Sequence, residues 1–197
     1  MHILGIMGSP RRNSNTETLL DRALAGAAVE GARTEKLLIS QVNIRPCMEL
    51  YHCAVDGTCS IHDDMSGLYD TLIAADAVIL ASPIFFYGLT SQTKALVDRC
   101  QALWVRQYVL KTWAPEKGQR HGAFIAVGAT KGPRLFDGVK LTAKYFFDAI
   151  GVDYSEELLV RGMDAMGEVR DHQSYLIGAS ELGRRLVVGA QPGLNGV

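Results

Sequence analysis

Short apolar runs alternate along this chain with longer segments in which apolar positions recur every three or four residues. A short apolar run bounded by polar residues or glycine is typical of a buried strand, and the longer recurrence is typical of one helix face. Five strands are predicted in this way, at residues 2–7, 33–39, 77–81, 122–127 and 152–160. The predicted helices are centred on residues 19–27 and 65–73 and cover residues 91–103, 135–150 and 172–188.

The regular alternation of strands and helices predicts an α/β fold. Strands joined through helices are parallel, and their right-handed crossovers place helices on both faces of the sheet. Together with a candidate phosphate loop after the first strand, this predicts a flavodoxin-like doubly wound five-stranded parallel sheet of order 2-1-3-4-5. Such sheets bind ligands at the carboxyl ends of their strands. The candidate binding loops are therefore residues 8–16, 82–91 and 128–134.

Composition and charge narrow the class of protein. A chain of 197 residues suits one domain with a full core, which we expect to span residues 1–188, followed by a flexible tail at 189–197. Hydrophobic content of 48% is that of a soluble globular protein, and a net charge of −1 argues against nucleic-acid and anionic-membrane partners. The longest apolar stretch, residues 74–86, is interrupted by polar residues, and no signal-like segment opens the chain. We therefore expect a cytoplasmic protein.

The loop at residues 8–16 reads Gly-Ser-Pro-Arg-Arg-Asn-Ser-Asn-Thr and leads directly from a strand into a helix. A helix N-terminus offers unpaired N–H groups and positive dipole, which suit a phosphate. The loop lacks the Gly-Lys-Ser/Thr ending of a P-loop and the third glycine of the dinucleotide fingerprint, so a mononucleotide is the expected cargo. The alternative is ordinary helix capping, with Ser14 as the N-cap and Glu17 completing a capping box.

The loop at residues 82–91 carries three consecutive aromatic side chains, at positions 85–87. Loops are normally exposed and polar, so an aromatic ligand lying against them is one explanation. The alternative is that Phe85 and Phe86 cover the end of the core.

Three segments of the chain resemble the NADPH-dependent FMN reductase family, in the branch that contains the iron–sulfur flavoproteins. They are the first loop, the Ser-Pro-Ile-Phe-Phe-Tyr-Gly segment with the following Lys-Ala-Leu-Val-Asp-Arg, and the segment from Gly128 to Gly138. The resemblance implies that the FMN phosphate is held by Ser9, Arg11, Ser14, Asn15 and Thr16. It implies that the isoalloxazine is lined by Pro83, Ile84, Phe85, Phe86, Tyr87 and Gly88 and closed on its other side by Ala129, Thr130, Lys131 and Gly132.

A cysteine-bearing loop at residues 43–62 is where the chain departs from that branch. Cluster-binding relatives have four cysteines here, and this chain matches three of them with Cys47, Cys53 and Cys59, whereas Leu50 stands at the fourth position. A [4Fe–4S] cluster normally takes four thiolates, so we expect none here. The gaps are too long for a usual zinc site, and no Cys-x-x-Cys redox pair is present. We expect a remnant loop that packs near the flavin or at a subunit contact, with Cys100 in the core.

The resemblance implies an FMN-dependent NAD(P)H oxidoreductase that passes electrons from NADH or NADPH to flavin, quinone or a redox protein. Because the flavin carries the chemistry, no catalytic side chain is expected. The alternative is an electron carrier of the flavodoxin or iron–sulfur flavoprotein type that is reduced by a partner protein. A homodimer or homotetramer is expected, since a second copy would cover the exposed aromatics of residues 85–87 and 104–113.

Overall fold

The computed structural model describes residues 1–115 and 119–189, and its centre is one parallel sheet. The sheet has the order β2-β1-β3-β4-β5, and every neighbouring pair is parallel. Its strands are β1 (His2–Met7), β2 (Arg33–Leu38), β3 (Ala77–Pro83), β4 (His121–Gly128) and β5 (Asp153–Arg161). The predicted fold class and strand order are therefore confirmed.

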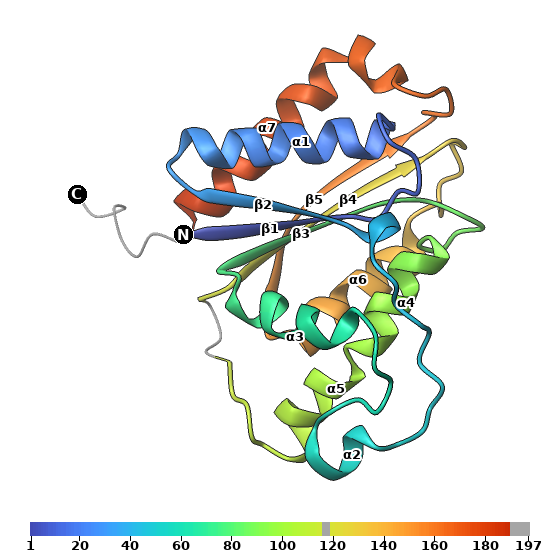
Figure 1. The fold of residues 1–197 in the computed structure, drawn as a ribbon. Coiled ribbons are helices and arrows are strands. Elements are labelled where there is room, and N and C mark those ends of the chain that lie inside the picture. Colours follow the sequence, from blue (N-terminus) through green and yellow to red (C-terminus); the bar gives the residue numbers. More distant parts are fainter. Residues whose placement is uncertain (116–118, 190–197) are drawn as a thin grey trace.

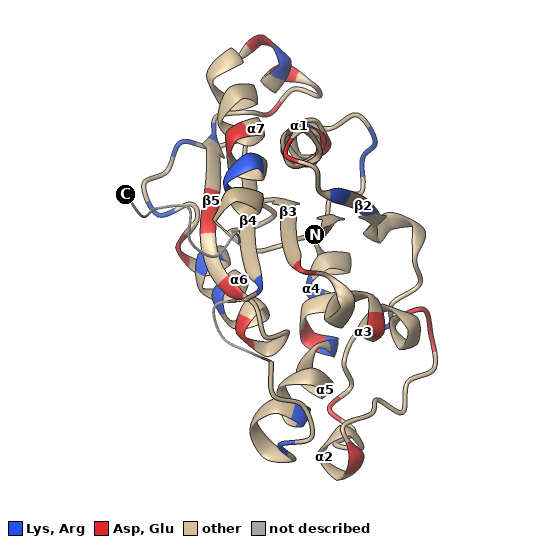
Figure 2. Cartoon of the chain, turned by 90° about the vertical axis from the view of Figure 1, so that its left-hand side faces the viewer, with Lys and Arg blue, Asp and Glu red and all other residues tan. Residues whose placement is uncertain are grey.

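Helices cover both faces of the sheet (Figures 1 and 2). One face carries α1 (Asn15–Val29) and α7 (Gln173–Val188), and the other carries α3 (Met65–Ala74), α4 (Ser91–Arg99), α5 (Gln101–Trp104) and α6 (Asp137–Ala149). The remaining described helical segments are short, namely α2 (Cys53–Asp56), two 3₁₀ turns (Ile39–Gln41 and Glu168–Asp171) and a π-helical turn (Val105–Val109). Each layer of helices encloses its own cluster of buried apolar side chains against the sheet.

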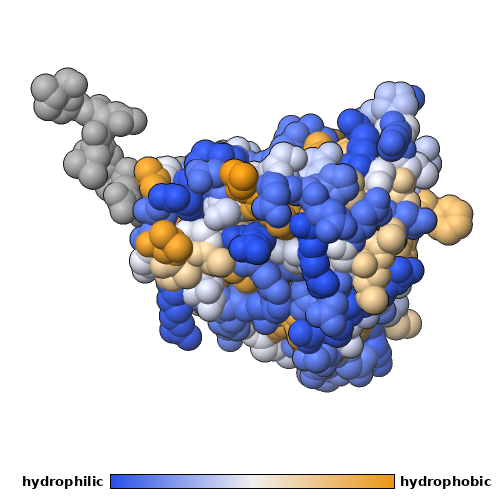
Figure 3. Space-filling view, turned by 90° about the horizontal axis from the view of Figure 1, so that it is seen from above, coloured by the Kyte–Doolittle hydropathy of each residue, from blue (hydrophilic) through white to orange (hydrophobic). Residues whose placement is uncertain are grey.

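Helices α1 and α7 lie in close contact because each contributes a glycine to the crossing. A Cβ atom at Gly26 would lie 2.1 Å from the Ser180 carbonyl oxygen, and one at Gly183 would lie 1.8 Å from the Ala23 carbonyl oxygen. These distances exclude any side chain. The outer surface of this layer is mostly hydrophilic (Figure 3).

The predicted helix at residues 91–103 is wrong in one respect, because the chain forms two short helices and a π-helical turn instead of one. The Cys100 N–H is shared between the carbonyls of Leu96 and Val97, which tightens the turn between α4 and α5. The polypeptide then widens into the π-helical turn, whose Arg106 contacts the cysteine-bearing loop.

Two further expectations concern the ends and exterior of the molecule. None of the helices within the described residues is long and apolar enough to cross a membrane. The expected tail at 189–197 lies, apart from Gly189, outside the described residues.

Candidate functional site

A cavity of about 150 Å³ opens at the carboxyl ends of the central strands. Loops that follow β1, β3, β4 and β5 line it, at the edge of the sheet where the strand order predicts a ligand. Its lining residues are Ser9, Pro10, Arg11, Ser14, Asn15, Thr16, Pro83, Ile84, Phe85, Val127, Ala129, Met163, Asp164 and Met166.

The first loop enters α1 through a side-chain cap, as predicted. The Ser14 hydroxyl accepts a hydrogen bond from the Glu17 N–H at 3.1 Å. The Glu17 carboxylate does not return to the Ser14 N–H as in a capping box; it accepts from the Asn13 N–H at 2.6 Å instead. Asn13 has the left-handed backbone conformation (φ 56°), which turns its N–H toward the helix.

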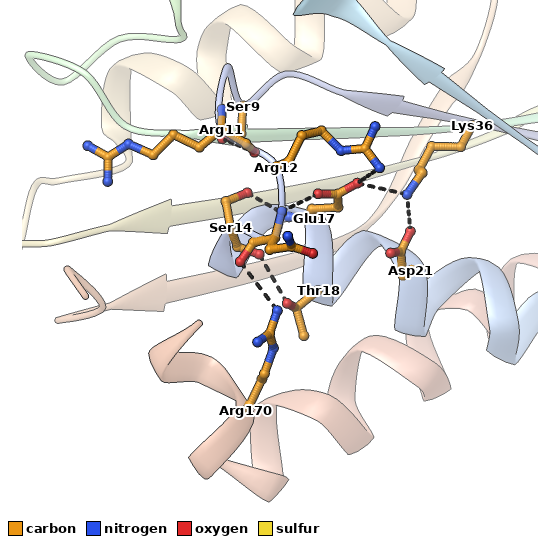
Figure 4. A network of polar contacts seen from close by, with 10 residues as sticks. Ser9, Arg11, Arg12, Ser14, Glu17, Thr18, Asp21, Lys36 and Arg170 are labelled. Atoms are coloured by element: carbon orange, nitrogen blue, oxygen red, sulfur yellow. Dashed lines mark hydrogen bonds and ion pairs between the residues drawn. The ribbon is translucent and has the colours of Figure 1, made fainter. Parts of the chain in front are cut away.

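Glu17 is nearly buried and is surrounded by positive groups (Figure 4). Its carboxylate lies 3.1 Å from Arg12 Nη2 and 3.0 Å from Lys36 Nζ, which also reaches Asp21 at 2.7 Å. Burial alone would raise the pKa of Glu17, but hydrogen bonds from Lys36 and Asn13 and the nearby charges outweigh burial and lower it. Glu17 is therefore ionised at neutral pH, and together with Asp21 it balances the charges of Arg12 and Lys36.

Arg11 differs from Arg12 in having no such partner. Its side chain is exposed, lines the cavity and forms no hydrogen bond or ion pair with any described residue. In Figure 4 the two guanidinium groups extend in different directions, and only that of Arg12 meets Glu17. A positive charge without an internal counter-charge thus stands beside the N-terminus of α1, an arrangement suited to an external anion.

Asn15 uses part of its side-chain amide within the protein. Its Nδ2 donates one hydrogen bond to the Ala165 carbonyl at 2.9 Å, and its Oδ1 accepts from the Val169 N–H at 3.0 Å. The amide therefore ties α1 to the segment after β5, while Asn15 also lines the cavity and its Nδ2 has a second N–H donor.

Two threonines that the sequence analysis did not single out fix the first loop against the loop after β3 and the start of α4. The Thr90 and Thr93 hydroxyls both donate to the Gly8 carbonyl, at 2.7 and 3.2 Å. A Cβ atom on Gly8 would lie 2.3 Å from Thr93 Oγ1 and 2.7 Å from the Ala81 carbonyl oxygen. Thr90 is also the N-cap of α4. The sequence could have indicated this role for Thr90, because threonine is a preferred residue at a helix N-cap.

The aromatic loop after β3 forms a tight hairpin. Phe85 and Gly88 exchange two backbone hydrogen bonds, of 3.0 and 2.9 Å, and the two residues between them have positive φ angles of 48° and 61°. This type I′ geometry normally favours Asn-Gly, and each non-glycine residue in it costs on the order of 1–3 kcal/mol. Phe86 is fully exposed and Phe85 and Tyr87 are about half exposed. The alternative that Phe85 and Phe86 cover the core is therefore wrong.

The residues expected around an aromatic ring fall into two groups. Pro83, Ile84, Phe85 and Ala129 line the cavity itself. The others are absent from the lining, and they are Phe86, Tyr87, Gly88, Thr130, Lys131 and Gly132. The Tyr87 side chain nevertheless lies near the loop after β4, since a Cβ atom built on Gly132 would be 3.7 Å from its hydroxyl.

The loop after β5 was missed by the sequence analysis and supplies Met163, Asp164 and Met166 to the cavity. It is joined to the loop after β4 by hydrogen bonds from the Gly162 and Met163 N–H groups to the Thr130 and Gly128 carbonyls. The predicted strand order could have revealed this loop, because β5 runs parallel to β4 and ends at the same edge of the sheet.

A second, larger cavity of about 650 Å³ lies at the cysteine-bearing loop, between α2, α5 and the π-helical turn. Cys47, Cys53 and Cys59 all line it, together with Leu50. Burial raises the pKa of the Cys53 thiol, and the neighbouring Cys59 and Cys47 raise it further. Cys100 is fully buried and donates to the Leu96 carbonyl, so its predicted place in the core is confirmed.

Known proteins share both the sequence pattern and the fold. The model of the family described as "NADPH-dependent FMN reductase" matches residues 1–135. An iron–sulfur flavoprotein of Methanocaldococcus jannaschii is 34% identical over 131 residues, which cover 66% of this chain and 64% of that protein. A Bacillus subtilis protein whose name describes an NAD(P)H-dependent FMN-containing oxidoreductase is 26% identical over 187 residues, covering 94% of this chain and 98% of that protein.

The fold also matches a solved structure of a flavone reductase, with a TM-score of 0.73 and 20% identity over 98% of this chain and 64% of that one. At this identity the likeness shows the fold alone. The chain spans slightly less than two thirds of the length of the archaeal iron–sulfur flavoproteins that it matches over 131 residues.

Proposed function

We propose a function from the premise that this chain belongs to the NADPH-dependent FMN reductase family: it binds FMN and acts as an NAD(P)H-dependent oxidoreductase. The observation that carries the proposal is the cavity at the N-terminus of α1. There, donors for a phosphate meet Arg11, whose side chain has no partner among the described residues, and the aromatic hairpin begins. This combination suits a ligand with a dianionic end and a flat aromatic end.

The phosphate end of FMN would lie against the first loop. The Ser9, Ser14 and Thr16 hydroxyls and the N–H groups of the first turn of α1 supply donors, and Arg11 supplies charge. Ser14 also serves as the helix cap, so its Oγ has one role inside the protein already. Asn15 would contribute the second N–H of its amide, since the first N–H and the oxygen hold the segment after β5.

The ring end of FMN would lie between the hairpin after β3 and the loop after β4. Residues 83–88 would line one side of the isoalloxazine, and residues 129–132 would close the other. Backbone N–H groups of these two loops would donate to the polar edge of the ring, and the half-exposed Phe85 would exclude water from it.

When bound, FMN supplies the redox chemistry, taking a hydride from NADH or NADPH and passing electrons to flavin, quinone or a redox protein. The role of the chain is to bind the group, to orient it and to leave one face open for the nicotinamide. No side-chain acid or base is required for this role, and we assign no catalytic residue.

We further propose that residues 1–188 act as one FMN-binding unit in the cytoplasm, as a homodimer or homotetramer. The support for an oligomer is the exposed apolar surface at two places, the hairpin and the region of the cysteine-bearing loop. Its members are Phe85, Phe86, Tyr87, Met48, Leu50, Tyr51, Trp104, Tyr108 and Val109, each at least 37% exposed. A second copy would remove this surface from water.

The test is an anaerobic titration of the purified, FMN-loaded protein with NADPH and NADH, followed by the flavin absorption. Rapid, stoichiometric bleaching supports the reductase. Bound flavin that either nucleotide leaves unbleached would contradict the reductase and favour an electron carrier fed by another protein. Protein that cannot be loaded with FMN would contradict both.

A further inference from the structure

The two ends of the cysteine-bearing loop lie side by side, and one buried arginine forms hydrogen bonds with both of them. Arg99, on α4, is 2% exposed. Its Nη1 donates to the Arg45 carbonyl at 2.9 Å and to Asp63 at 2.7 Å, and its Nη2 donates to the Ile61 carbonyl at 3.0 Å and to Asp63 at 3.2 Å. One guanidinium therefore holds both ends of the loop.

A second arginine holds the loop near its tip. Arg106, in the π-helical turn, donates from Nε to the Gly57 carbonyl at 2.7 Å. Gly57 has a φ of +78°, and a Cβ atom there would lie 2.6 Å from Arg106 Cγ, so the two residues are in tight contact. We call Arg99 and Arg106 the arginine clamps.

Between the clamps, three cysteines of the loop line the same cavity. Cys47, Cys53 and Cys59 line the cavity of about 650 Å³, and Leu50 lines it with them. Positions 47, 50 and 53 follow the spacing of the Cys-x₂-Cys-x₂-Cys run found in cluster-binding proteins, with leucine at the middle position.

The donor set of this cavity does not fit a [4Fe–4S] cluster, which normally takes four thiolates. A leucine side chain has no donor atom, and Cys100 is fully buried in the core, away from the cavity lining. Among the described residues, no group of three or more His, Cys, Asp or Glu side chains is arranged to hold a metal ion.

We propose that this loop is a cluster site lacking one ligand, that Leu50 occupies the position of that ligand, and that the arginine clamps hold the loop in shape without metal. A metal bound in a loop normally supplies folding free energy to it. Here the buried Arg99–Asp63 ion pair and the Arg106–Gly57 hydrogen bond attach the loop to α4 and to the π-helical turn instead.

Leu50→Cys tests the missing ligand, with Leu50→Ser as the matched control because serine has nearly the size of cysteine but offers a weaker, harder donor. Each protein is reconstituted anaerobically with iron, sulfide and a thiol reductant, desalted with chelator, and assayed for iron and acid-labile sulfide. We expect Leu50→Cys to retain about four irons per chain and the unmodified and Leu50→Ser proteins to retain none. Far-ultraviolet circular dichroism and a thermal melt, measured on the same samples, report that each protein is folded.

Retention of a cluster by the unmodified protein would overturn the proposal, because three thiols would then suffice. Failure of folded Leu50→Cys to retain iron would also overturn it, because position 50 would then not be the ligand position. Neither outcome depends on whether the protein oxidises NADPH, so the proposed function is tested separately.

Limited proteolysis tests the arginine clamps. Chymotrypsin suits the loop, because residues 46–62 include Leu50 and Tyr51 but no lysine or arginine. We expect chelator to leave the cleavage rate of the unmodified protein unchanged. Arg106→Gln should raise the rate by about 2- to 10-fold, as the loss of one hydrogen bond implies, whereas Lys144→Gln, on an exposed face of α6, should not. Faster cleavage on chelation, or no effect of Arg106→Gln, would contradict the clamp.

Discussion

Arg11→Ala is predicted to weaken FMN binding selectively. The Arg11 guanidinium lines the cavity and has no partner among the described residues, so its removal leaves no buried charge behind. A hydrogen bond to a charged group contributes about 1.5–3 kcal/mol, which corresponds to an increase of about 10- to 150-fold in Kd. Because Arg11 is exposed, the lower part of that range applies at physiological salt, and the effect should shrink as salt increases.

The assay is a titration of flavin-free protein with FMN and, separately, with riboflavin, which has the same ring and no phosphate. Arg11→Ala should lower the affinity for FMN and leave the affinity for riboflavin unchanged. Arg12→Ala is the control variant, because Arg12 pairs with Glu17 at 3.1 Å and is not in the cavity lining. Equal losses for FMN and riboflavin, or equal effects of the two variants, would remove Arg11 from the phosphate site.

Three other variants test the framework of the site. Gly8→Ala should lower the free energy of unfolding by about 1–3 kcal/mol, because its Cβ would lie 2.3 Å from Thr93 Oγ1; an unchanged denaturant midpoint would contradict the close packing. Asn15→Ala should cost about 1–3 kcal/mol and weaken FMN, because two backbone groups after β5 lose their partner; calorimetry and the FMN titration measure the two losses. Glu17 has a folded pKa below its ordinary 4.5, so its stabilisation is present above that pH and is lost as the pH falls through the folded value. Glu17→Gln should therefore be less stable than the unmodified protein at neutral pH, and the difference should shrink in acid.

Much of the fold was predictable from the sequence, because the signals for it are local. The apolar runs gave the five strands, and the Ser14 cap marked the start of α1. The buried face of α6 was predicted from the helical spacing of Val139, Ala143 and Phe146. Leu135, in the same series, is buried just before the helix begins. The pattern missed the break between α4 and α5 at Cys100. The break arises because the Cys100 N–H is shared between two carbonyls, which the spacing of apolar residues does not reveal.

The candidate site was predictable only in part, because most of its organisation comes from contacts between distant residues. The sequence placed both Asn15 and Arg11 at the ligand, since an amide and a guanidinium are both suitable donors. The fold engages the amide with residues 150 or more positions away, whereas the guanidinium pairs with none of the residues that the structure describes.

By itself, then, the sequence determined the class of fold, the order of the strands and three of the four loops that line the cavity, because periodicity, strand-to-helix spacing and loop motifs are properties of the chain. The tertiary structure decided which side chains in those loops are engaged and which remain available. It also decided that the thiols at residues 47, 53 and 59 share one cavity with Leu50. The physical reason is that hydrogen-bond partners and burial depend on neighbours in space, and those neighbours are set only when the sheet and both helical layers have packed.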